Sequence, residues 1–355
     1  MPVSKRYQNI FFIFGVAVLA FMVSQLDFHV VGQGLAHAGY WFFAVVALWA
    51  VLYVLNTAAW WLILQNGRKP KDGGEGSGGV GQGGVDGVVA RPKLGFFHLY
   101  RLTVSGFALN YATPGGLMGG EPYRILAITP YVGAERATSS VVLYAMTHIF
   151  SHFWFWLLSA FLFVFLHPVS VFMACLLMAV VAFCALGIWF FLRGYRHGLA
   201  MSVMRVVTRV PFVRAWATRF VATHEGALAK VDEQIAALHR QRPKTFAGAV
   251  GLELACRVAS ALEIYFILRV LMPSVGYPDC ILILAFTSLL ANLLFFMPLQ
   301  LGGREGGFVL SADGLGLTSN AGIFVALIVR LRELIWVAIG LLFIKLEPRR
   351  RQVEK

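Results

Sequence analysis

Two short segments of the sequence place a proline, paired glycines and an acid in the same order. The first reads PGGLMGGE from Pro114 to Glu121, and the second reads PLQLGGRE from Pro298 to Glu305, with the same spacing from proline to glutamate. Glycine permits backbone conformations in which several N–H groups approach one ligand, so such loops can hold an anionic group. The glycines that lie shortly before the acids are Gly119 and Gly120 in the first segment and Gly302 and Gly303 in the second.

Both acids lie within apolar stretches, residues 96–136 and 279–319. An ionised carboxylate in such a stretch is costly unless it is paired or hydrated. The nearest candidate partners are Arg124 for the first acid and Arg304 for the second. A functional charge at membrane depth is one interpretation, and ion pairs that only lock the two segments to the rest of the protein are the other.

Two long apolar segments carry further charges. Glu253 and Arg257 are four residues apart, so on a helix they share a face and can pair. Arg330, Arg332 and Glu333 lie near the middle of the last apolar segment. An excess of arginine suits a phosphate-bearing lipid, because the guanidinium group binds phosphate through several donors. Buried structural ion pairs are the alternative.

His148 and His152 have the spacing of a helical metal pair, but no HExxH acid accompanies them. Packing or hydrogen bonding is therefore the favoured role of this pair, ahead of a proton relay or a metal site. The four cysteines have no CxxC spacing and are interpreted as packing residues. We expect no metal, no cofactor and no nucleic-acid partner.

The composition excludes a water-soluble globular protein. The chain has 355 residues, of which 59% are hydrophobic and only 13% are charged, whereas soluble domains have about 25% charged residues. Its apolar runs are long enough to cross a membrane as helices. We therefore predict an all-α polytopic membrane protein formed by one domain, residues 1–355. The predicted full spans are residues 9–25, 40–64, 137–166, 169–192, 245–272 and 320–346.

The distribution of lysine and arginine predicts the orientation of these spans. Of the 30 basic residues, 22 lie at the N-terminus, in residues 68–93, in residues 193–244 or after residue 344, and the predicted external loops 25–38, 167–169 and 273–279 have none. Basic residues that flank spans are retained in the cytoplasm. We expect an inner-membrane protein with both termini in the cytoplasm.

With this orientation, residues 96–136 begin and end in the cytoplasm, and residues 279–319 begin and end outside. Each stretch is too short for two crossings and is broken by proline and glycine, which predicts two re-entrant hairpins of opposite orientation. They would form an inverted repeat, an arrangement that places a polar site near the midplane of many transporters. Chance similarity of two glycine-rich turns is the alternative.

Two linkers differ in character. Residues 68–93 contain a glycine-rich run and are expected to form a flexible cytoplasmic loop. Residues 193–244 have arginines interleaved with apolar residues, which is typical of amphipathic helices on an anionic membrane surface. An ordinary basic loop that only sets the topology is the favoured alternative.

The run from Asn110 to Arg124, together with the Pro298–Glu305 motif and the arginine-bearing segment 330–333, resembles the lysylphosphatidylglycerol synthase transmembrane region family of flippase-like proteins. In that family the membrane region is implicated in moving lipids between leaflets, for example aminoacylated phosphatidylglycerol. The positions carried over by this resemblance are Pro114, Glu121, Arg124, Pro298 and Glu305. Two-domain members add a soluble aminoacyl-transferase domain, which this sequence lacks, so we expect it not to be that enzyme.

The resemblance and the polar residues together predict a translocase for a membrane lipid, most simply an anionic one. Glycine-loop N–H groups and arginines would hold the head group, and Glu121 and Glu305 would bind the protons that drive transport. A membrane-embedded head-group transferase or phosphatase with Glu121 as base is the alternative from the enzyme class. A scaffold that binds lipid-synthesis enzymes is the third interpretation.

Overall fold

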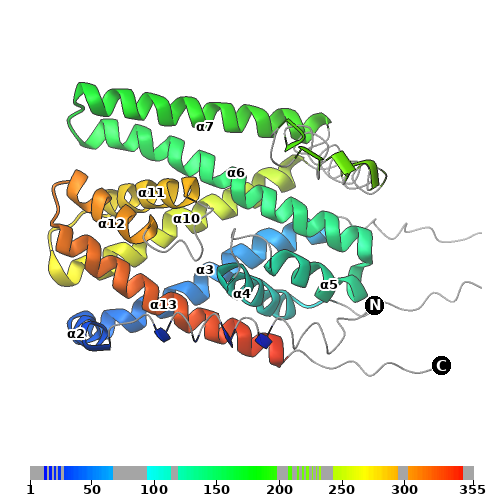
Figure 1. Ribbon diagram of the computed structural model, residues 1–355, viewed down its shortest axis with the longest axis horizontal. Coiled ribbons are helices and arrows are strands. Elements are labelled where there is room, and N and C mark those ends of the chain that lie inside the picture. The colour runs from blue at the N-terminus through cyan, green and yellow to red at the C-terminus, as the bar shows by residue number, and fades with distance from the viewer. Residues whose placement is uncertain are drawn as a thin grey trace, which may run out of the picture.

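The computed structural model describes residues 28–66, 94–112, 119–197, 243–294 and 303–346, with isolated positions between 12 and 24 and between 207 and 232. All the elements that these residues form are α-helices (Figure 1). They are α2 (Phe28–Ala38), α3 (Tyr40–Asn66), α4 (Phe96–Ala112), α5 (Gly120–Val132), α6 (Ala134–Leu166), α7 (Val171–His197), α10 (Pro243–Leu271), α11 (Tyr277–Leu293), α12 (Gly303–Gly314) and α13 (Ser319–Lys345). The all-α class predicted from the sequence is confirmed.

Five long helices coincide with predicted spans and run along the long axis of the molecule in Figure 1. Of these, α3, α6 and α7 are long and apolar enough to cross a membrane. Helices α10 and α13 have similar lengths but carry several charged residues near their middles. The predicted span at residues 9–25 and most of the linkers 68–93 and 193–244 lie outside the described residues.

Each of the two broken stretches forms a pair of short helices. Helices α4 and α5 pack against each other, and so do α11 and α12. Figure 1 shows the two pairs at opposite ends of the molecule. The breaks within the pairs, residues 113–118 and 295–302, lie outside the described residues, and so do Pro114, Pro298 and Gly302.

The loop predicted at residues 25–38 contains a helix instead. Residues 28–38 form α2, which packs against α13. A side chain at Gly34 would meet the Leu327 side chain at 2.7 Å, and Ala38 is buried. Tertiary packing of small residues therefore stabilises a helix that two glycines make unfavourable locally.

The apolar core consists of two main clusters, one around each pair of short helices. The first joins α4 and α5 to the ends of α3, α6 and α13, and the second joins α11 and α12 to the other ends of α3, α10 and α13. On α13 the second cluster ends at Leu331 and the first begins at Val337. The buried charges Arg332 and Glu333 lie between them, so a polar layer separates the two clusters.

Close contact between α4 and α13 depends on Gly340. A Cβ atom there would lie 2.6 Å from the Ala108 Cβ and 2.8 Å from the backbone oxygen of Val104. Both neighbours belong to α4, whose backbone cannot yield without moving the helix.

We predict that Gly340→Ala lowers the thermal unfolding midpoint of the purified protein, because overpacking costs about 1–3 kcal/mol. Gly251→Ala is the matched control, since a Cβ at that position of α10 would meet nothing within 4 Å. The control should be neutral or stabilising, because alanine favours helix over glycine. Equal midpoints for the two variants would contradict the proposed close contact.

Candidate functional site

One buried carboxylate joins the two broken stretches. Glu333, on α13, is only 3% exposed. The Tyr111 hydroxyl, in the last turn of α4, donates to its Oε2 at 2.5 Å, and Arg304, at the start of α12, forms an ion pair with its Oε1. A residue just before the first break and a residue just after the second break therefore meet at a single side chain in the polar layer.

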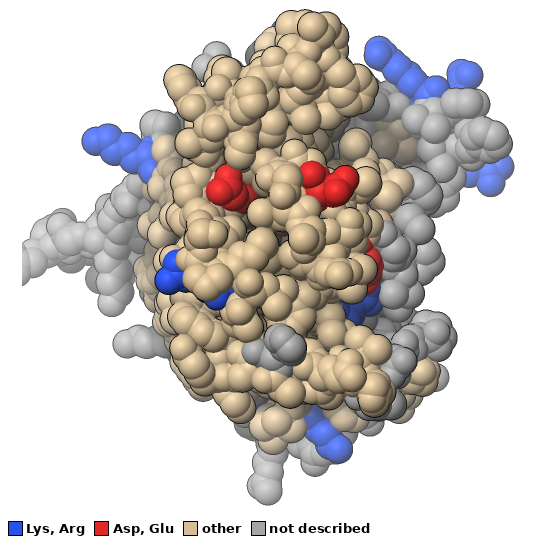
Figure 2. Space-filling view, turned by 90° about the vertical axis from the view of Figure 1, so that its left-hand side faces the viewer, with Lys and Arg blue, Asp and Glu red and all other residues tan. Residues whose placement is uncertain are grey.

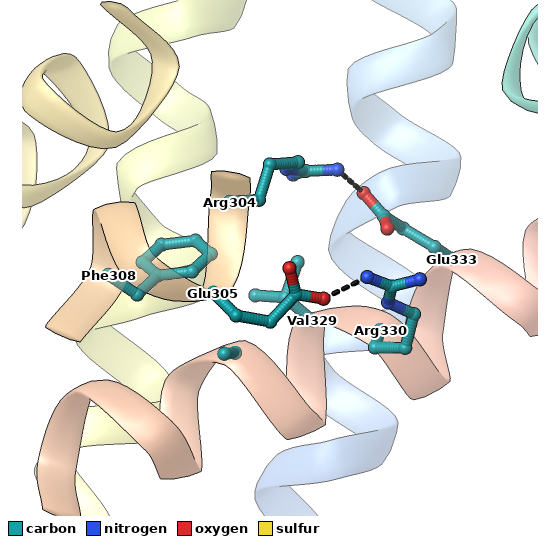
Figure 3. Close-up of a pocket in the computed structure, with 7 residues that line it drawn as sticks. Arg304, Glu305, Phe308, Val329, Arg330 and Glu333 are labelled. Carbon is teal, nitrogen blue, oxygen red and sulfur yellow. Dashed lines mark hydrogen bonds and ion pairs between the residues drawn. The ribbon is translucent and has the colours of Figure 1, made fainter. Parts of the chain in front are cut away.

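A second ion pair reinforces this junction. Glu305 pairs with Arg330, one turn before Glu333 on α13 (Figure 3). The expectation that Glu305 pairs with Arg304 is wrong, because consecutive helical residues point in different directions. Residues 330 and 333 share a face of α13, so α12 and α13 form two ion pairs of opposite polarity.

The pocket between these pairs is small. It is lined by the four charged side chains with Phe308, Ala326 and Val329 (Figure 3), and its volume is about 10 Å³. This is about the space that one water molecule needs. A lipid head group therefore requires movement of α12 away from α13.

Deeper in the bundle, Arg332 is held by Glu263 of α10. The Arg332 Nε and Nη2 atoms donate to the two carboxylate oxygens at 2.7 and 2.9 Å, and Trp49 of α3 donates to the same carboxylate at 2.9 Å. The guanidinium carbon lies 3.9 Å from the centre of the Trp49 ring. Its Nη1 lies 3.8 Å from the Glu333 Oε1, so this group adjoins the α12–α13 junction.

Sequence reasoning missed Glu263, although an acid within the predicted span 245–272 was a usable signal. With Glu263 included, the arginines of the candidate site no longer outnumber its acids. The arginines are Arg124, Arg257, Arg304, Arg330 and Arg332, and the acids are Glu121, Glu253, Glu263, Glu305 and Glu333. The expected excess of arginine is therefore wrong for these residues.

The first glycine motif forms a separate polar group between α4 and α5. Glu121 pairs with Arg124 at 3.3 Å, as expected from the sequence, and also accepts from the Asn110 amide at 2.9 Å. The Asn110 oxygen accepts from the Gly120 N–H at 2.7 Å. A Cβ at Gly120 would lie 2.2 Å from a backbone oxygen of Gly106, so this glycine is required for close contact of the two helices.

Arg124 itself is buried at 5% exposure and donates from Nη2 to the Thr103 carbonyl oxygen at 3.0 Å. Its guanidinium carbon also lies 5.4 Å from the centre of the Tyr144 ring and 5.7 Å from that of Trp60. Gly119 precedes α5 and is buried, and Gly303 is the buried first residue of α12.

Glu253 and Arg257 do not pair with each other, contrary to the expectation from their spacing. Glu253 is hydrogen-bonded to the His148 Nδ1 of α6 at 2.8 Å. The Asn56 amide nitrogen, in its hydrogen-bonding orientation, lies 3.0 and 3.2 Å from the two carboxylate oxygens. Arg257 instead donates to Ser151 and to the His148 carbonyl oxygen. The described residues contain no cluster of three His, Cys, Asp or Glu side chains suited to a metal ion.

The chain matches the family described as Lysylphosphatidylglycerol synthase TM region over residues 10–340. The chain belongs to this family. Membership supports a membrane protein with a lipid-related function, and the matched region is the membrane part of the family. Comparisons with curated proteins and with solved structures found no match. In this family member, the residues described above provide the candidate lipid-handling site.

We predict that Glu263→Gln strongly destabilises the protein. It leaves Arg332, which is 1% exposed, without the carboxylate that accepts two of its hydrogen bonds, and breaking such a buried pair costs about 3–5 kcal/mol. Glu305→Gln is the comparison variant, because the Glu305 side chain is 37% exposed and its ion pair with Arg330 is less deeply buried. Thermal unfolding in detergent should show a much larger decrease for Glu263→Gln. Similar decreases would contradict the different burial of the two pairs.

Proposed function

We propose that this protein is a lipid translocase that moves an anionic or modified phospholipid, or a polyprenyl-phosphate lipid, between the leaflets of the inner membrane. The observation that carries this proposal is the junction at Glu333. One buried carboxylate holds Tyr111 of the first broken stretch and Arg304 of the second. Family membership, which supports a lipid-related function, agrees with it.

The proposed mechanism is alternating access at this junction. The two broken stretches are predicted to enter from opposite sides, and their helix pairs lie at opposite ends of the molecule (Figure 1). If α4–α5 moves, Tyr111 leaves Glu333, and if α12 moves, Arg304 leaves it. Each movement would expose the polar layer to a different side of the membrane, as in transporters with inverted repeats.

A lipid phosphate is suited to open the α12–α13 pocket. Arg304 and Arg330 are both engaged by carboxylates in the closed pocket. A phosphate can replace a carboxylate in such a contact, because it also accepts two parallel N–H donors from one guanidinium group. The head group would then enter by exchange of partners, and no arginine would remain unpaired at membrane depth.

Protonation of the acids would supply the coupling. A neutral Glu305 no longer forms an ion pair with Arg330, and a neutral Glu121 no longer forms one with Arg124. Each event would favour release of the corresponding short helices. Transport by the reconstituted protein that does not change with pH would contradict this part of the proposal.

The charge distribution supports the proposed orientation, with both termini in the cytoplasm. The end of the molecule beside α11 and α12 shows few charged side chains among its described residues (Figure 2). The basic side chains Arg193, Lys244 and Lys345 lie at the ends of helices that lead to the opposite end. Basic residues mark the cytoplasmic side, so α11 and α12 would lie near the external side.

The test is transfer of labelled anionic lipids between leaflets of proteoliposomes. We predict transfer by the wild type and a decrease of about tenfold or more in Glu121→Gln and Glu305→Gln, since each loses a charge-assisted contact worth about 1.5–3 kcal/mol. Asp313→Asn is the matched control, because Asp313 is an exposed acid on the same helix as Glu305. This control should transfer lipid at the wild-type rate.

Wild-type vesicles that transfer no faster than empty vesicles, across a panel that includes aminoacyl and polyprenyl lipids, would overturn the translocase proposal. Chemical turnover of a lipid without transfer would favour a head-group transferase. Neither activity, with a stable complex of lipid-synthesis enzymes, would favour a scaffold.

A further inference from the structure

Arg257 differs from the other arginines of the candidate site. Arg124, Arg304, Arg330 and Arg332 each form an ion pair with a carboxylate. Arg257 has no carboxylate within 4.0 Å among the described residues, although Glu253 is one turn away on the same helix. A guanidinium group in this position needs a counter-charge or water.

The position of Arg257 is also unusual. It is the central residue of α10, which extends from Pro243 to Leu271, and it is only partly buried. His148, whose backbone oxygen accepts from Arg257, lies near the middle of α6. The His148 side chain is 42% exposed. Two polar side chains are therefore accessible at mid-depth of two neighbouring long helices.

The hydrogen bonds of Arg257 hold the guanidinium plane but do not use all of its donors. Nε donates to the Ser151 hydroxyl at 2.7 Å, and Nη2 donates to the His148 carbonyl oxygen at 2.9 Å. Nη1 has no hydrogen bond to the described residues and is not among their buried unpartnered atoms. The side chain is thus oriented by α6 and still presents a donor to an approaching group.

The nearest acid, Glu253, does not prevent an anion from binding beside Arg257. Glu253 is 1% exposed and lies beneath His148, with His148 and Asn56 as its partners. The imidazole Nδ1 faces this carboxylate, and Nε2 has no hydrogen bond to the described residues. A protonated His148 would donate from Nε2 to the same anion that contacts Arg257.

We propose that Arg257, with His148 beside it, binds the phosphate of a lipid head group at mid-depth of the membrane. This inference rests on the proposed function, because it takes the bound lipid to be the one that crosses the membrane. A phosphodiester passing the apolar middle of the membrane loses its hydration, and Arg257 supplies the missing counter-charge and a donor at that depth. Arg257 would therefore be a transit contact on the α6–α10 surface, separate from the α12–α13 pocket.

The binding test uses the full-length purified protein in detergent. Its thermal unfolding midpoint is measured with dihexanoyl phosphatidylglycerol, with dihexanoylglycerol, which has no phosphate, and with inorganic phosphate. We expect only the phosphatidylglycerol to raise the midpoint of the wild type. The increase should disappear in Arg257→Gln and persist in part in Arg257→Lys, which keeps the charge but loses the planar group.

Arg269→Gln is the matched control, because Arg269 lies in the last turn of the same helix. Among the described residues it donates to the Pro273 carbonyl oxygen just after the helix and lies over the Tyr265 ring. This variant should respond to phosphatidylglycerol as the wild type does. An equal response in Arg257→Gln would overturn the inference. Equal stabilisation by dihexanoylglycerol would overturn the phosphate contact, and equal stabilisation by inorganic phosphate would overturn the choice of a lipid head group over a free anion.

Leaflet transfer separates this inference from the proposed function. We expect Arg257→Gln to transfer lipid about tenfold more slowly than the wild type, since it loses one charge-assisted contact. If the wild type transfers lipid and Arg257→Gln transfers it at the same rate, the inference is overturned and the translocase is supported. Lipid stabilisation that depends on Arg257, without any transfer by the wild type, would support the lipid site and overturn the translocase.

Discussion

The structure depends on the cost of placing charge in an apolar environment. An arginine or glutamate in the middle of a membrane helix needs a partner or water, because lipid tails cannot compensate its charge. Glu333 shows how strongly this constrains the fold. It binds both Tyr111, which precedes the first helix break, and Arg304, which follows the second. The last turn of α4 and the first turn of α12 are therefore fixed in place by contacts with the same side chain.

The apolar residues complete this arrangement rather than define it. Two clusters surround the two pairs of short helices, and the charged layer lies between them on α10 and α13. Glycines such as Gly340 bring α13 close enough to α4 for the layer to form. The ion pairs are specific in geometry, yet each can exchange its carboxylate for another anion. In the proposed mechanism, this exchange is what opens the layer to a charged head group.

Local features of the chain predicted much of the fold. The apolar runs at 40–64 and 137–166 correspond to α3 and α6 because length and hydropathy determine which segments form long membrane helices. Proline and glycine predicted the interruptions that separate α4 from α5 and α11 from α12. Helix α2 was not predicted, because its stability comes from packing on α13 and not from its own glycine-containing sequence.

The sequence by itself determined the class of protein, the helices and most of the residues that lie in the polar layer. These follow from hydropathy and periodicity, which are properties of neighbouring residues. The tertiary structure decided the partners. Glu305 pairs with Arg330 and not with Arg304, and Glu263 holds Arg332. Arg257 donates to residues of α6 and does not pair with Glu253. These contacts join residues far apart in the chain, so they depend on which helices lie side by side.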